Sequence, residues 1–212
     1  MQAYAPTTTN LVHSKINKRI FIPKLMFAPI LGFAIVSGHI YVEDGFWDTT
    51  WEVVSFLILL IAAFGRVWTS AFISGRKDNE LVTDGPYSTT RNPLYFFSLL
   101  GYIGAGLAFE KLLVAVGFAI IFLLSHWPTI LAEEKKLRGR YGDRYDEYAR
   151  TVPRFFPRIG QLTMRESVTF SPRTFTRAVL DCALIMSVFV LAHFIEYAQS
   201  AHWVPVYFHN IW

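Results

Sequence analysis

The feature that most constrains the fold of this chain is a set of five apolar runs. They cover residues 24–42, 51–73, 94–109, 112–130 and 178–197. A helix needs about 20 apolar residues to cross the hydrocarbon core of a bilayer. Backbone groups in lipid must also be hydrogen-bonded within their own segment, which excludes open strands. The runs therefore predict an all-α, polytopic membrane protein of about five transmembrane helices, and the mean hydropathy of +0.33 agrees with this.

The third and fourth runs are joined by only Glu110 and Lys111. So short a connection predicts an antiparallel helical hairpin. The single cysteine, Cys182, lies inside the fifth run, which excludes a disulfide framework and a cysteine-rich metal site. No cluster of His, Cys and Asp has the linear spacing of metal ligands, so we predict no metal.

The basic residues predict how the chain is oriented in the membrane. A cytoplasmic N-terminus places all but two of the 20 lysines and arginines on the cytoplasmic side, the exceptions being Arg66 and Lys111. The positive-inside rule therefore predicts a multi-pass protein with a cytoplasmic N-terminus and a non-cytoplasmic C-terminus. The same charges attract anionic head groups. We accordingly predict membrane lipids as partners and no nucleic acid, although the net charge is +4.

A first unusual cytoplasmic segment covers residues 81–95. Gly85 and Pro86 mark a turn, and Pro93 suits the first turn of the helix that follows. The start of a helix exposes unpaired N–H groups and a positive dipole end, which favour an anionic group such as a carboxylate. The alternative is a plain loop in which Arg91 reaches the lipid phosphates.

A second unusual segment begins at the inner end of the fourth run with Glu133 and Glu134. Neighbouring side chains on a helix point about 100° apart, so at most one of the two can face a given interior squarely. A carboxylate buried there needs a cationic or hydrogen-bonding partner, and either Arg91 or the ammonium group of a ligand would serve. Three tyrosines follow at helical spacing and predict an aromatic stripe at the membrane interface: Tyr141, Tyr145 and Tyr148.

Taken in order, these motifs form a recognisable series. Gly-Pro-Tyr (85–87) and Arg-x-Pro-x-Tyr (91–95) precede the hairpin, and Glu-Glu (133–134), Tyr-Gly-x-x-Tyr-x-x-Tyr (141–148) and Val-Pro-Arg-Phe (152–155) follow it. The series resembles the isoprenylcysteine carboxyl methyltransferase and phospholipid methyltransferase group of membrane enzymes. The resemblance covers roughly a third of the chain. In that family the two segments close around S-adenosylmethionine from the cytosolic side.

The resemblance implies a membrane-embedded methyltransferase that uses S-adenosyl-L-methionine at the cytoplasmic face. Its acceptor would be lipophilic, a small molecule or a lipid-linked group, and would carry a carboxyl, amine or thiol. Glu133 is expected to hold the cofactor at its amino group or ribose. Arg91 and Glu134 are the expected catalytic residues, with Glu134 as the base for an amine or thiol acceptor. The other expected cofactor-binding residues are Leu81, Val82, Tyr87, Asn92, Pro93, Leu94 and Tyr95.

Two positions depart from the family pattern. The family has His where this chain has Asn92, and an amide cannot take up a proton charge. A family arginine tied to the acceptor is Thr129 here, which should weaken preference for a carboxylate acceptor. We expect Arg66 to turn inward and restore that cation, because an arginine facing lipid costs about 2.5 kcal/mol or more at mid-membrane depth. With His126 as a second candidate base, these residues make up the predicted acceptor site.

The apolar runs, the basic residues and the resemblance together divide the chain. Residues 1–23 would form a cytoplasmic tail, 24–74 two transmembrane helices, 75–160 the methyltransferase core with its cytoplasmic cofactor-binding region, and 161–212 a linker, a fifth transmembrane helix and a non-cytoplasmic tail. Two alternatives stay open. One is an NADPH-dependent membrane reductase of related fold, although such proteins are typically much longer. The other is a non-catalytic membrane scaffold or lipid-binding relative, which the two departures would fit.

Overall fold

Three helices in the computed structural model are long and apolar enough to cross a membrane: α2 (Phe46–Ile73), α5 (Leu112–Tyr141) and α7 (Pro172–Ser200). A shorter apolar helix, α4 (Pro93–Leu107), packs among them. The structure describes residues 28–38, 45–76, 79–168 and 171–208, and over these residues it is helical apart from loops and one isolated β-bridge. The predicted all-α polytopic fold is confirmed. Of the predicted first span, residues 28–36 are helical, and most of the rest lies outside the described residues.

The long helices extend beyond the apolar runs that predicted them. α2 begins at Phe46 instead of residue 51, and α5 continues past residue 130 to Tyr141. A helix does not have to end where the hydrocarbon ends, because its backbone hydrogen bonds are internal and equally well made in water. This extension matters for function, since it carries Glu133 and Glu134 on a rigid helix instead of a loop.

The predicted hairpin forms between α4 and α5. Its close approach depends on Gly106, where a Cβ atom would lie 2.3 Å from the Cα of Ala115 on the facing helix. Small residues at helix contacts let backbones approach in this way. The turn ends at Glu110, whose φ of 56° is left-handed. Lys111 then donates a hydrogen bond of 3.0 Å to the carbonyl of Ala34, which joins the 28–36 helix to the turn.

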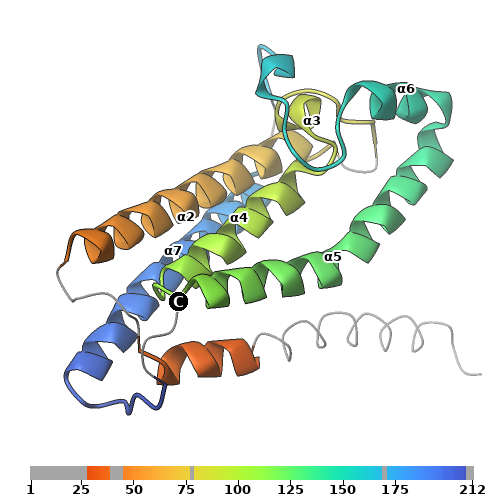
Figure 1. Ribbon diagram of the computed structural model, residues 1–212. Coiled ribbons are helices and arrows are strands. Elements are labelled where there is room, and N and C mark those ends of the chain that lie inside the picture. Colours follow the sequence, from red (N-terminus) through yellow and green to blue (C-terminus); the bar gives the residue numbers. More distant parts are fainter. Residues whose placement is uncertain (1–27, 39–44, 77–78, 169–170, 209–212) are drawn as a thin grey trace, which may run out of the picture.

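The helices α2, α4 and α7 run side by side, whereas α5 diverges from α4 toward its C-terminal end (Figure 1). Pro128 lies inside α5, where a proline removes one helical hydrogen bond and permits a bend. At the far end of the bundle sit the short helix α3 (Pro86–Thr89), α6 (Asp143–Thr151) and the 3-10 turn η1 (Ile159–Gln161). They assemble beyond the divergence of α4 and α5, where the candidate site lies.

Candidate functional site

A cavity of about 300 Å³ lies where α4 begins and α5 ends. It is walled by the 80–95 segment, the C-terminal turns of α5, and α6. The structure brings all eight predicted cofactor-binding residues to its lining: Leu81, Val82, Tyr87, Asn92, Pro93, Leu94, Tyr95 and Glu133. The two predicted catalytic residues, Arg91 and Glu134, line it as well. The cofactor-binding and catalytic residues that were predicted from the sequence therefore line one cavity.

The 84–92 segment is held in place by backbone pairing with the 153–163 segment. Gly85 adopts a φ of +58°, and a Cβ atom there would lie 2.3 Å from the ring of Phe72, so the turn requires glycine. The Gly85 N–H donates to the carbonyl of Thr163 at 2.7 Å, and the Arg91 N–H donates to that of Pro153 at 2.9 Å. Since these bonds are backbone to backbone, they fix the loop whatever the cavity binds.

Glu134 is the buried centre of the site. One of its carboxylate oxygens accepts a hydrogen bond of 3.0 Å from the side-chain amide of Asn92. The other accepts a hydrogen bond of 3.0 Å from Nε of Arg154 and lies 3.5 Å from a terminal nitrogen of Arg91. Donors from the segments before α4 and after α6 thus meet on one carboxylate of α5. This arrangement satisfies a buried charge, which would otherwise be costly.

The Asn92 amide explains one departure from the family pattern. Its nitrogen donates to Glu134 and also, at 2.9 Å, to the carbonyl of Arg154. Both bonds need only an N–H donor and no proton exchange, so an amide meets the geometric demand of this position.

Glu133, next to the buried Glu134, is exposed and faces the cavity from α5. Its carboxylate lies opposite the hydroxyl of Tyr95. Burial, followed by the charge of Glu133, raises the pKa of Tyr87. Tyr87 is therefore neutral at physiological pH. The cavity wall thus places the carboxylate of Glu133 beside tyrosine hydroxyls, a combination suited to a ligand ammonium or hydroxyl group.

The predicted interfacial stripe of tyrosines is wrong for Tyr145 and Tyr148. Tyr145 is fully buried and Tyr148 is 8% exposed, and both line the cavity with Tyr141. The Tyr148 hydroxyl donates a 2.8 Å hydrogen bond to the carbonyl of Tyr87, and burial raises its pKa. Helical spacing alone does not separate a stripe that faces head groups from one that packs beneath a loop.

Several lining residues were not predicted. Lys136, Leu137 and Arg140 face the cavity from α5, and Ile73 and Glu80 complete its edge. Counted from Glu133, the α5 residues recur at i+3, i+4, i+7 and i+8, one face of a helix. That periodicity was present in the sequence and would have identified them.

The three predicted acceptor-binding residues lie outside this lining. Arg66 turns inward as expected, but its guanidinium pairs with Asp181 of α7 at 2.8 Å and hydrogen-bonds Ser98 of α4. His126 stacks on Phe122, with ring centroids 4.2 Å apart, and Thr129 is exposed. None of the three is among the described residues that line the cavity. Acceptor binding by Arg66, His126 and Thr129 therefore stays a prediction that the geometry of the cavity does not support.

Comparison with known proteins identifies a matching family model and several relatives of this chain. The phospholipid methyltransferase family model matches residues 45–144. The nickel-cobalt-cadmium resistance protein NccN of Alcaligenes xylosoxydans xylosoxydans is 32% identical over 194 residues, 89% of this chain and 88% of that protein. The cobalt-zinc-cadmium resistance protein CzcN of Cupriavidus metallidurans is 36% identical over 160 residues, 73% of this chain and 74% of that protein.

A protein-S-isoprenylcysteine O-methyltransferase of Schizosaccharomyces pombe is 30% identical over 83 residues, 39% of this chain and 35% of the enzyme. No solved structure matches the chain. The motifs that line the cavity, the family model and these relatives lead to one assignment: the chain belongs to the isoprenylcysteine carboxyl methyltransferase and phospholipid methyltransferase family of integral membrane proteins.

Proposed function

We propose that this protein is an S-adenosylmethionine-dependent methyltransferase that binds its cofactor in the cavity between α4 and α5 and methylates a lipophilic acceptor. The observation that carries the proposal is the convergence of all eight expected cofactor-binding residues on that one cavity. Lys136 and Arg140 add cations to a lining that already holds Glu133. The lining therefore offers both a carboxylate and cations to pair with a zwitterionic amino-acid group.

Each residue has a role in this proposal. Glu133 would hold the ammonium group, with Tyr95 beside it, and the start of α4 would orient a carboxylate through its free N–H groups. The bound cofactor supplies an activated methyl group, so the protein needs to supply alignment and a dry site. Glu134 is committed to Asn92, Arg91 and Arg154. A positioning role therefore fits it better than that of a base.

The acceptor would enter from the membrane. On the orientation predicted from the basic residues, the cavity lies at the cytoplasmic end of the helices. The divergence of α5 from α4 leaves apolar helix faces beside it, with exposed Trp127 and Leu131 on α5. A cofactor from water and an acceptor from lipid could then meet without either crossing the other phase.

Calorimetry with S-adenosylhomocysteine on the purified full chain tests the cofactor assignment. Glu133→Gln should weaken binding by about 10–150-fold, the equivalent of one charged hydrogen bond of about 1.5–3 kcal/mol. Glu147→Gln is the matched control, an exposed carboxylate on α6 outside the lining. Binding of NADPH in place of S-adenosylhomocysteine would favour the reductase alternative, and binding of neither would favour a scaffold.

A second proposal concerns the physiological setting. The two relatives that match most of this chain are named for resistance to nickel, cobalt, zinc or cadmium. We propose that the methylated product contributes to tolerance of such ions. Expression of wild type in a metal-sensitive bacterial host should improve growth in nickel or cobalt, and Glu133→Gln should abolish the improvement. Equal growth with wild type and with Glu133→Gln would show that metal tolerance does not depend on methylation.

A further inference from the structure

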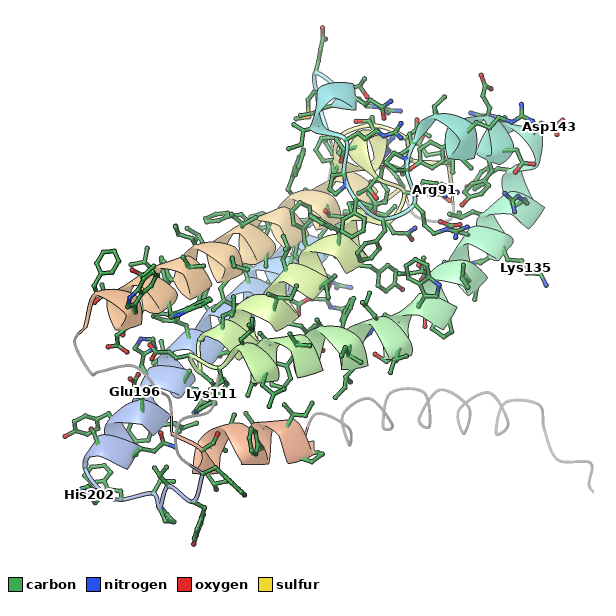
Figure 2. All side chains as sticks on the ribbon, in the orientation of Figure 1. Arg91, Lys111, Lys135, Asp143, Glu196 and His202 are labelled. Atoms are coloured by element: carbon green, nitrogen blue, oxygen red, sulfur yellow. The ribbon has the colours of Figure 1, made fainter. Side chains whose placement is uncertain are left out.

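A second cluster of chemically active side chains lies at the opposite end of the helices from the cavity. α2 contributes its first turns, α7 its last turns, and the α4–α5 turn completes the cluster. Figure 2 shows Glu196 and Lys111 at this end, far from Arg91. The acidic and imidazole members are Asp48, Glu52, Glu110, His193 and Glu196.

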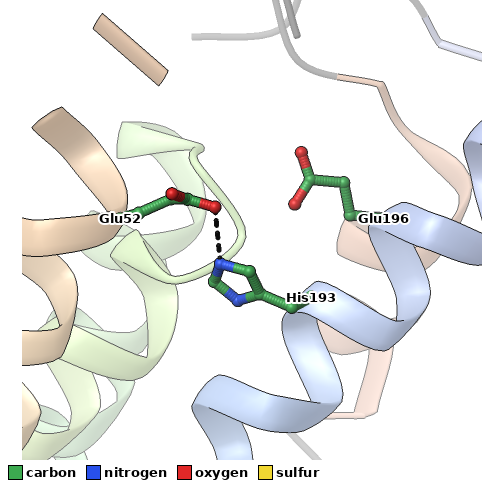
Figure 3. A group of neighbouring side chains, drawn as sticks. All are labelled: Glu52, His193 and Glu196. Carbon is green, nitrogen blue, oxygen red and sulfur yellow. Dashed lines mark hydrogen bonds and ion pairs between the residues drawn. The ribbon is translucent and has the colours of Figure 1, made fainter. Parts of the chain in front are cut away.

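Three of these side chains are arranged like ligands of a single ion. His193 and Glu196 are three residues apart on one face of α7, and Glu52 faces them from α2 (Figure 3). His193 Nε2 is 2.8 Å from a carboxylate oxygen of Glu52. One donor atom from each of the three residues lies within 4.8 Å of the others. Donors bound to one ion at about 2.0–2.2 Å are at most about 4.4 Å apart, so small rotamer changes would close the site.

The imidazole of His193 is oriented as in a metal-binding histidine. Its Nδ1 lies 3.0 Å from the carbonyl oxygen of Phe189, and because a carbonyl can only accept, Nδ1 carries the proton. Nε2 faces the Glu52 carboxylate oxygen at 2.8 Å. A positive centre between these two atoms, either a proton or a metal ion, is needed to hold them at this distance. A backbone carbonyl that fixes the tautomer in this way is the usual outer partner of a metal-ligating histidine.

The surroundings add negative charge. Asp48 and Glu110, 6% and 5% exposed, share Glu196 as a neighbour. Lys111 is the cation close to Glu110 and Glu196, and its amino group already donates to the carbonyl of Ala34. The carboxylates of Asp48, Glu52 and Glu196 thus face one lysine and one imidazole. A divalent ion would offset the excess.

We propose that Glu52, His193 and Glu196 form a binding site for one divalent transition-metal ion, with Asp48 as supporting charge. One imidazole with carboxylates and no thiolate favours Zn²⁺, Ni²⁺ or Co²⁺ over softer ions. The three ligand residues are partly exposed, so the ion would enter from the aqueous side of this end. The proposal is independent of methyl transfer, since the two sites share no residue.

Cobalt provides a direct test on the purified, chelator-treated full chain. Co²⁺ should bind with a stoichiometry of one and produce visible d–d absorption bands. Glu52→Gln and Glu196→Gln should each weaken binding at least tenfold, since loss of mere outer partners of metal ligands costs about 10–100-fold. His202→Asn is the matched control. His202 is an exposed histidine near the same end with a φ of 59°, which asparagine tolerates.

A second variant keeps the test decisive if the glutamine variants fold poorly. His193→Cys replaces the imidazole with a thiol, and Co²⁺ should then give a thiolate charge-transfer band that wild type, with Cys182 elsewhere on α7, lacks. Absence of that band in a folded His193→Cys variant would overturn the proposal. Loss of Co²⁺ binding in the His202→Asn control would overturn it as well. So would a wild-type chain that binds no Co²⁺, Ni²⁺ or Zn²⁺, which would identify the cluster as an imidazolium–carboxylate pair. The affinity for S-adenosylhomocysteine, measured without metal, tests the cofactor cavity independently of the metal site.

Discussion

Replacing Glu134 with glutamine should separate the roles of the two adjacent glutamates. The change keeps the oxygen that accepts from Asn92 but removes the charge that faces two arginines. Arg91 is 11% exposed, and removing one partner of a buried pair costs about 3–5 kcal/mol. Because Arg91 also borders the cavity, water can recover part of that cost. Arg154 is 43% exposed, so its contribution is below about 1 kcal/mol.

We therefore expect Glu134→Gln to destabilise the protein by about 2–4 kcal/mol. At about 2–4 °C per kcal/mol for a chain of this size, the unfolding midpoint should fall by roughly 4–16 °C. Tryptophan fluorescence during heating in detergent micelles, at one fixed scan rate, would measure it. Glu133→Gln is the adjacent control, and its exposed side chain should change stability by less than about 0.5 kcal/mol. Equal midpoints for the two variants would refute the argument that Glu134 holds the cavity walls together.

Three further predictions concern other contacts. Gly106→Ala should lower the unfolding midpoint sharply, because its Cβ would lie 2.3 Å from the Cα of Ala115; an unchanged midpoint would show that the hairpin can open without cost. Tyr148→Phe loses its hydrogen bond to Tyr87 and should cost about 0.5–1.5 kcal/mol in the same melting assay, whereas no loss would make that bond dispensable. Burial, with smaller contributions from neighbouring acids, raises the pKa of Glu110 from 4.5 to about 9. The folded chain thus holds a proton that the unfolded chain releases, so wild-type stability should fall as pH rises from about 5 to 9. Glu110→Gln should flatten this dependence, and parallel profiles for the two proteins would contradict the assignment.

The fold followed from the sequence wherever a local pattern controlled it. The two-residue linker at Glu110 and Lys111 predicted the hairpin, and Pro93, predicted in the first turn of the third helix, is the first residue of α4. Residues of the candidate site could be predicted where a sequence motif falls on the helix face that lines the cavity, as at Glu133. Tyr145 was misjudged because burial beneath a loop depends on how α6 packs, which spacing does not encode. The contact of His193 with Glu52 joins residues 141 positions apart, and only the packing of α7 on α2 brings them together.

The length of α4 sets the depth at which the cavity lies. Its 15 residues span about 22 Å at 1.5 Å per residue, whereas the hydrocarbon core is about 30 Å thick. The shortfall of about 8 Å has to be made up at the ends of the helix. In a bilayer, we therefore expect residues 81–92 and α6 to cover the start of α4 at the level of the outermost methylenes of the acyl chains. An amphiphilic molecule resting in the leaflet would present its polar end at that level without being lifted out of the membrane.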